Sequence, residues 1–204
     1  QLPGIRDVTH VTTGNSFIAW ADTNCQIWVR DKLDKLTIPS PVTVPGMCDI
    51  RQMSAGYYHI LVLDSLGFVY SMGCNTYGQL GHGAIENAQA IARIPSLSDV
   101  VEISSGANHN ICLCSNGNVY GFGCNETGEI GLGKQYVCSQ TPKLIEFPIE
   151  GIRIVTIGCG SNFSVFCDSA KDVWLCGNNS YGLLGFRDLK TRWIPEISPV
   201  FAGM

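Results

Sequence analysis

Short apolar runs separated by turn residues follow one another along the chain, and no segment shows the spacing of a long amphipathic helix. In the middle of the chain, Ile60–Leu63 and Phe68–Met72 flank a turn, and Asn110–Cys114 and Val119–Phe122 flank Asn116-Gly117. An Asn-Gly pair between apolar runs predicts a hairpin, because a type I′ turn requires positive φ at both central residues. The pattern therefore predicts an all-β protein built from antiparallel hairpins.

The same hairpin pattern occurs near both ends, in Phe17–Trp20 with Cys25–Val29 and in Ser164–Cys167 with Val173–Cys176. Further apolar runs precede the hairpins, and a short predicted strand with a proline at or near its start follows two of them. These flanking runs are Val100–Ile103, Ile154–Ile157, Pro142–Ile145 and Ile194–Ile197. Each unit is thus expected to contain about four short antiparallel strands.

Two glycine-containing elements recur along the chain. A glycine-rich segment begins at Gly73 and returns at Gly123 and Gly177, 50 and 54 residues apart. A Gly-x-x-ring element lies upstream of each copy, at Gly56, Gly106 and Gly160, and a fainter copy begins at Gly14. Four-stranded units of this period predict β-propeller blades. We expect one propeller segment over 1–204, with approximate repeats 1–46 (degenerate), 47–96, 97–150 and 151–204.

These elements resemble the repeats of the regulator of chromosome condensation family, most closely over Gly56–Gly83 and nearly as well over Gly106–Gly133. The resemblance implies a propeller of that type, of whose seven blades this chain would supply about four. A WD-repeat propeller is less favoured because no Trp-Asp dipeptide occurs and the period is longer.

The resemblance implies a protein-interaction module, part of a larger regulatory or scaffold protein. The alternative it implies is a guanine-nucleotide exchange factor for a small GTPase of the Ran type. An acidic family residue would precede the ring of each Gly-x-x-ring element, and none of the matching residues is acidic. These are Ser16, Tyr58, Asn108 and Asn162. The family's β-hairpin wedge is not visible either, so the exchange-factor alternative ranks second.

Residues that recur at equivalent places are expected to serve structure. Several glycines of the glycine-rich segments should form tight turns at positive φ, from the group Gly73, Gly78, Gly123, Gly128, Gly177 and Gly182. The two histidines should hydrogen-bond within their own blades. The full set of recurring residues is Gly56, His59, Gly73, Gly78, Gly81, Gly106, His109, Gly123, Gly128, Gly131, Gly160, Gly177, Gly182 and Gly185.

Composition narrows the class further. Hydrophobic residues make up 45% and charged residues 15%, which excludes a disordered tail. A net charge of -4 argues against nucleic-acid binding, which draws on clustered cations. No apolar run is long enough to insert in a membrane. The ten cysteines lie mostly in apolar runs, which favours a reduced protein in the cytoplasm, with the nucleus as the alternative location.

No catalytic, cofactor or metal site stands out, and the sequence predicts a protein that is not an enzyme. The glycine segments are followed by strands, not by the helix that a phosphate loop requires. Cys112, Cys114, His109 and Cys124 suggest a zinc set, but the two alternate cysteines lack the turn of a Cys-x-x-Cys site.

Partner discrimination is expected in segments that differ between repeats, because the regular positions must satisfy the same packing everywhere. The candidates are the loops after the glycine segments, namely Ala84–Arg93, Lys134–Gln140 and Phe186–Trp193. The third loop combines an aromatic with cations in an acidic protein, and we predict that it binds an acidic patch on a protein partner. Its predicted binding residues are Arg187, Lys190, Arg192 and Trp193.

Overall fold

The computed structural model describes residues 7–31, 41–44, 46–47 and 49–201. Within these residues the chain forms four antiparallel sheets, each drawn from one continuous stretch of sequence. We number them as blades. Blade 1 contains β1 (Val8–Thr13), β2 (Phe17–Asp22) and β3 (Ile27–Asp31). Blade 2 contains β4 (Ile50–Ala55), β5 (His59–Asp64), β6 (Val69–Gly73) and β7 (Ala88–Arg93).

The remaining two blades also have four strands each. Blade 3 contains β8 (Val100–Ser105), β9 (His109–Cys114), β10 (Val119–Cys124) and β11 (Cys138–Leu144). Blade 4 contains β12 (Ile154–Cys159), β13 (Phe163–Asp168), β14 (Val173–Gly177) and β15 (Arg192–Ile197). The predicted all-β architecture of antiparallel blades is therefore confirmed.

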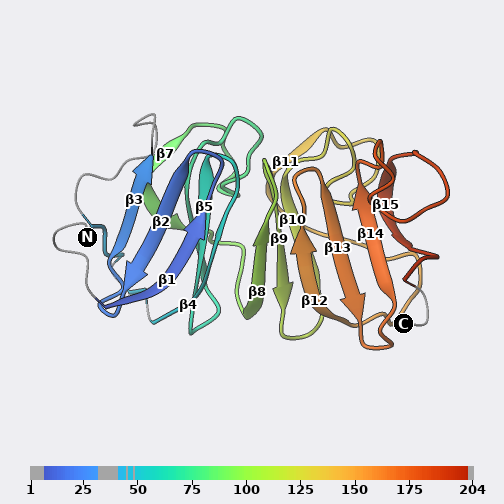
Figure 1. Cartoon of the computed structure of the whole chain (residues 1–204). Helices are drawn as coiled ribbons and strands as arrows, with labels where there is room; N and C mark the ends of the chain where they lie inside the picture. The colour runs from blue at the N-terminus through green and yellow to red at the C-terminus, as the bar shows by residue number, and fades with distance from the viewer. Residues whose placement is uncertain (1–6, 32–40, 45, 48, 202–204) are drawn as a thin grey trace.

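The blades follow one another in chain order, and their first strands are neighbours. β1 contacts β4, β4 contacts β8, and β8 contacts β12, so these strands form the inner row around the propeller axis. The connections β6–β7, β10–β11 and β14–β15 run along the upper edge of the molecule in Figure 1. The repeated sequence pattern thus becomes a radial arrangement in which equivalent loops share one face.

The hairpins lie where the apolar pattern predicts them, with one local difference in blade 1. Cys25, expected at the start of a strand, lies in the turn before β3 with φ 56°. The outer strands β11 and β15 begin at Cys138 and Arg192, earlier than the expected Pro142 and Ile194. Arg192 and Trp193, expected in a loop, are therefore the first residues of a strand.

The apolar core lies between adjacent blades. One cluster joins blades 1 and 2, a second joins blades 2 and 3, and a third joins blades 3 and 4. In the third cluster, Ile111 and Leu113 of blade 3 pack with Phe166 and Trp174 of blade 4. Burial of such side chains contributes roughly 2 kcal/mol each, and here it depends on the neighbouring blade being in place.

The two repeated histidines link one blade to the next, and the expectation of hydrogen bonds within each blade is wrong. His59 Nε2 lies 2.8 Å from Asn110 Oδ1, and His109 Nε2 lies 3.0 Å from Ser164 Oγ. Each partner belongs to the following blade. The rings point across the interface because each lies against the glycine three residues earlier, where a Cβ atom would collide with the ring. Sequence equivalence identified these residues but could not specify the direction of the ring.

Polar side chains of the inner strands also bridge the blades. Gln52 bonds both backbone groups of Ile103, donating from Nε2 at 2.8 Å and accepting at Oε1 at 2.9 Å. Glu102 occupies the equivalent place and accepts from Thr156 Oγ1 at 3.1 Å. The two Gln52 bonds satisfy backbone groups of Ile103 beside the axis.

Candidate functional site: the loop between β14 and β15

The loop between β14 and β15 starts with the third glycine-rich segment. Its turn glycines Gly177, Gly182 and Gly185 have φ of 115°, 71° and 71°, a region that side chains with a Cβ atom rarely adopt. The equivalent glycines of blades 2 and 3 also have positive φ, which confirms the expectation for these turns. Those glycines are Gly73, Gly78, Gly81, Gly123, Gly128 and Gly131.

A buried asparagine in each glycine segment holds the loop that follows. Asn179 accepts from the Leu184 amide at 3.0 Å and donates to the Asp188 carbonyl oxygen at 2.8 Å. Asn75 and Asn125 make the same two kinds of bond in their own loops. Our reading of the sequence missed these asparagines as structural residues, although their recurrence in all three glycine segments was the available signal. Each asparagine therefore links the glycine-rich segment, which is similar in all three blades, to the loop after it, which differs between blades.

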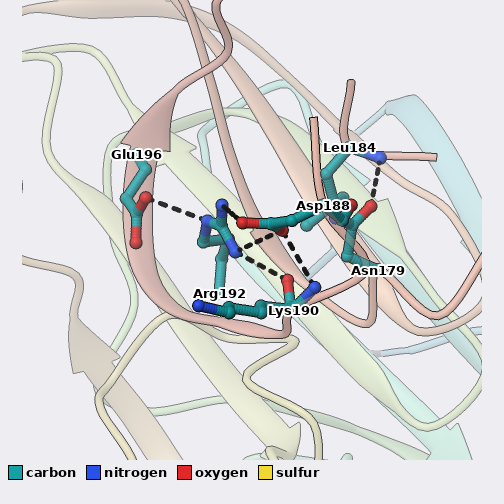
Figure 2. Close-up of polar contacts among 6 residues, drawn as sticks. All are labelled: Asn179, Leu184, Asp188, Lys190, Arg192 and Glu196. Carbon is teal, nitrogen blue, oxygen red and sulfur yellow. Dashed lines mark hydrogen bonds and ion pairs between the residues drawn. The ribbon is translucent and has the colours of Figure 1, made fainter. Parts of the chain in front are cut away.

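Arg192 organises the remainder of the loop (Figure 2). Its Nη2 lies 3.1 Å from Asp188 Oδ2, its Nε lies 2.9 Å from Glu196 Oε2, and Nη1 donates to the Lys190 carbonyl oxygen at 2.8 Å. The guanidinium also lies over the Phe186 ring, 4.0 Å from its centroid. Because its hydrogen bonds to Arg192 favour the carboxylate, the pKa of Asp188 is below its usual value. Arg192 therefore stabilises the loop from within.

The four predicted binding residues fall into two pairs. Arg187 and Lys190 are exposed, and neither forms an ion pair within the part of the chain that the structure describes. Arg192 is only 11% exposed at its side chain and has two acidic partners. Trp193 is half-buried, and its carbonyl oxygen accepts from the Gly133 amide of blade 3 at 2.9 Å. The structure thus leaves two of the four free to contact a partner through charge.

Trp193 lies beside the equivalent loop of blade 3. Lys134 Nζ lies 5.9 Å from the centroid of its indole ring. Next to this contact is a hollow of about 480 Å³ between blade 3 and β15. Its apolar walls include Leu132, Leu144 and Ile194, and Lys143 lies over the Tyr136 ring at 5.4 Å. Two of the three variable loops therefore meet at one rim of the molecule.

Other chemistry finds no support among the described residues. No three histidine, cysteine or acidic side chains of this part of the chain come close enough together to hold a metal ion. Burial raises the pKa of Cys124 to about 12 and that of Cys159 to about 11, so these thiols stay protonated at neutral pH. No helix in the described ranges is long and apolar enough to span a membrane.

The antiparallel sheets follow one another around an axis in chain order, and repeated glycine and ring side chains lie where adjacent sheets meet. This arrangement defines a segment of a β-propeller. The pattern described as "Regulator of chromosome condensation (RCC1) repeat" matches residues 67–113 and 116–167, and a second pattern of the same description matches 50–79 and 100–129. The chain belongs to this repeat family.

Individual relatives agree with this assignment. Human Protein RCC2 is 36% identical over 200 residues, covering 93% of this chain and 31% of RCC2. The crystal structure of human WBSCR16 has a TM-score of 0.77 at 23% identity, covering 97% of this chain and 55% of that one. Yeast RCC1 (Prp20) has a TM-score of 0.74 at 20% identity, covering 94% and 50%. The chain thus spans about a third of RCC2 and about half of each solved propeller.

Proposed function

We propose that this chain is a protein-interaction module of the RCC1-repeat type, and that its rim at blades 3 and 4 binds an acidic patch on a protein partner. The observation that carries the proposal is the pair of ion pairs that Arg192 forms with Asp188 and Glu196. By bonding Asp188 and Glu196 internally, Arg192 fixes the loop while Arg187 and Lys190 remain exposed on it. Because the backbone of this loop is already ordered, binding through its cations costs little backbone conformational entropy, which favours affinity.

Surrounding features support the same surface. The chain as a whole carries a net charge of -4, so the exposed cations Arg187 and Lys190 are a local departure that can orient an acidic partner. Lys134, which lies over the Trp193 ring of the same loop region, adds a third cation to this rim. The adjacent hollow offers apolar contact through Leu144 and Ile194, which are about half exposed. An acidic segment with an aliphatic or aromatic side chain would match both features. We place this function in the cytoplasm, with the nucleus as the alternative.

Charge reversal tests the proposal. Proteins captured from cell lysate by the chain would be identified and purified. Each would then be titrated against the double variant Arg187→Glu/Lys190→Glu. The control is Lys171→Glu, a charge reversal at the opposite end of blade 4. We expect the double variant to weaken binding at least tenfold with unchanged thermal stability, and the control to bind normally. Retention of every partner by the double variant would eliminate this rim as the interface.

Arg192 and Trp193 are unsuitable for that test. Replacing Arg192 removes its ion pairs with Asp188 and Glu196, and replacing Trp193 removes the contact of its indole ring with Lys134. The exchange-factor alternative needs a separate assay, release of a fluorescent guanine nucleotide from a panel of small GTPases. We expect no acceleration. A clear acceleration that survives the Arg187→Glu/Lys190→Glu change would favour the alternative and place its site elsewhere on the propeller.

A further inference from the structure

The outer strand of blade 3 pairs with its neighbour for one residue more than the outer strands of blades 2 and 4 do. In those two blades the pairing ends at the first glycine of the glycine-rich segment, Gly73 or Gly177. In blade 3 the pairing continues past the equivalent Gly123 to Cys124, whose register partner is Cys138. Two cysteines therefore lie opposite each other on β10 and β11.

The hydrogen bond beside this pair shows how close the two cysteines lie. The Asn125 amide donates to the Val137 carbonyl oxygen at 2.8 Å. Because this bond joins the residues just beyond the two cysteines, Cys124 and Cys138 form a non-hydrogen-bonded pair of the antiparallel ladder. Such a pair has its Cα atoms about 4.5 Å apart and both side chains on one face. Disulfides join cysteines whose Cα atoms are roughly 4.4–6.8 Å apart, so the backbone already has a spacing that an S–S bond accepts.

The other cysteines of the described strands face residues of different types. Cys112, Cys114, Cys159, Cys167 and Cys176 each have an aliphatic, aromatic, serine or threonine residue as register partner. Cys74, the equivalent of Cys124 in blade 2, lies 3.0 Å from the Thr76 hydroxyl. Within the described strands, only Cys124 and Cys138 are register partners of one another.

The two thiols differ in their access to solvent. Cys138 is half-buried on β11, which is an edge strand of blade 3. Cys124 is buried, and its thiol donates to Glu129 Oε1 over 3.7 Å. Burial raises the pKa of Cys124 to about 12, and the Glu129 carboxylate acts in the same direction. A reagent in solution therefore meets Cys138 first, and Cys124 reacts second.

We propose that Cys124 and Cys138 form a redox-modification site, whose substrate is a small-molecule disulfide of the glutathione class and whose product is a disulfide across β10 and β11. The geometry that supports it is the register of the two strands, because no backbone movement is needed to bring the two Cβ atoms together. The site goes beyond the binding rim proposed above and does not depend on it.

The reaction consists of two thiol–disulfide exchanges. In the first, the Cys138 thiolate attacks one sulfur of oxidised glutathione, so that a mixed disulfide forms, the glutathione S–S bond breaks and one glutathione leaves. In the second, Cys124 attacks Cys138 Sγ, the protein disulfide forms and the second glutathione leaves. Two electrons pass from the cysteines to oxidised glutathione, and the two cysteine protons end on the two glutathione thiols.

The new bond closes the loop 125–137 at its base. This loop carries Lys134, which lies over the Trp193 ring, and Tyr136, which lines the adjacent hollow. A cross-link between the ends of the loop restricts the unfolded chain and so favours the folded state. We therefore expect oxidation to lower the equilibrium constant of unfolding at least tenfold, and dithiothreitol to restore the original value.

Oxidised glutathione is the probe for the site. The reduced, folded chain would be incubated with it, the remaining thiols would be alkylated, and unreduced tryptic peptides would be analysed by mass spectrometry. We expect peptide 135–143 to be linked to peptide 94–134, with fragmentation placing the link at Cys124. Urea unfolding of the oxidised and reduced chains measures the change in stability.

Two serine variants provide the matched comparison. Cys138→Ser changes the more accessible thiol, and we expect it to abolish both the link and the effect of the oxidant on unfolding. Cys74→Ser changes the equivalent of Cys124 in blade 2, and we expect it to leave both unchanged. Loss of the link in Cys74→Ser would overturn the proposal.

Three results with the unmodified sequence would also overturn the proposed site. The first is a glutathione adduct on Cys138 that never passes to Cys124. The second is a link from Cys138 to any other cysteine. The third is a link that forms only in urea, because the folded strands would then not hold the two thiols in reach of each other.

Discussion

In blades 2 and 4 the carboxylate of one aspartate stabilises the turn of the central hairpin by hydrogen bonds. Asp64 Oδ1 accepts from the Leu66 and Phe68 amides, and its Oδ2 accepts from the Tyr70 hydroxyl. Asp168 makes the same kind of contacts and binds the Trp174 indole at 2.9 Å. Acceptance of backbone amides by a nearby aspartate favours the turn over continued strand. One residue thus sets both the turn and the position of a core aromatic.

Lys171 occupies the turn position at which blades 2 and 3 have glycine. Its φ is 72°, in a region that costs a residue with a Cβ atom about 1 kcal/mol. We therefore expect Lys171→Gly to raise the free energy of unfolding by about 0.5–1 kcal/mol, measured by urea titration, after the entropic cost of glycine is subtracted. Lys171→Ala keeps the strain and serves as the control. An equal gain from both variants would show that the lysine side chain, and not backbone strain, was responsible.

At the scale of the element, two of the three glycine loops make a contact with the next blade at their central glycine. Gly78 of blade 2 abuts Gln140 of β11, and Gly128 of blade 3 abuts Arg192 and Trp193 of β15. A Cβ atom at either position would collide with backbone of the outer strand. The third member, Gly182, has open space instead, with its nearest atom, Leu189 Cδ2, 3.7 Å from a built Cβ. The three equivalent loops therefore carry the same backbone geometry under different packing.

Because Gly128 and Gly182 differ in packing but not in backbone conformation, alanine at each position distinguishes the cost of backbone strain from the cost of a steric clash. Gly128→Ala and Gly182→Ala share a positive φ, of 82° and 71°, so each should lose about 1 kcal/mol of unfolding free energy from conformation alone. Only Gly128→Ala also pushes β15 away from blade 3, and we expect it to lose about 2 kcal/mol more. Thermal and urea unfolding of both variants measure this. Similar losses would mean that β15 gives way easily and that the contact adds little.

At the scale of the whole molecule, the buried histidines make the fold sensitive to acid. Burial lowers the pKa of His59 to about 4, and burial together with the charge of His59 lowers the pKa of His109 to about 3. In the unfolded chain both titrate near the ordinary value of 6.5. Between pH 6.5 and about 4 the unfolded state therefore binds more protons than the folded state, and stability falls as the pH falls.

The expected slope is about 1.4 kcal/mol per pH unit for each histidine in that window, with no contribution above it. His109→Phe should reduce the slope by one histidine's share, since Ser164 keeps its bond to the Glu129 carbonyl oxygen. Urea unfolding at pH 4.5, 5.5 and 7.5 measures both effects. An unchanged slope in the variant would show that other groups cause the acid sensitivity.

The sequence by itself determined the class of fold, because short apolar runs separated by turn residues and the recurrence of Gly73, Gly123 and Gly177 are local properties of a blade. Hairpins form between neighbours along the chain, so their position can be predicted from residues close in sequence. The recurrence of His59 and His109 likewise marked them as structural. Neither observation requires knowledge of contacts between distant residues.

Only the tertiary structure decided which neighbour each side chain meets. The partners of His59 and His109 lie 51 and 55 residues away, across blade interfaces. Of the four predicted binding residues, Arg192 proved to stabilise its own loop, because folding brings Asp188 and Glu196 to either side of it. A cation in a sequence looks the same whether it faces a partner or an internal carboxylate, and only the packing of the strands around it distinguishes the two.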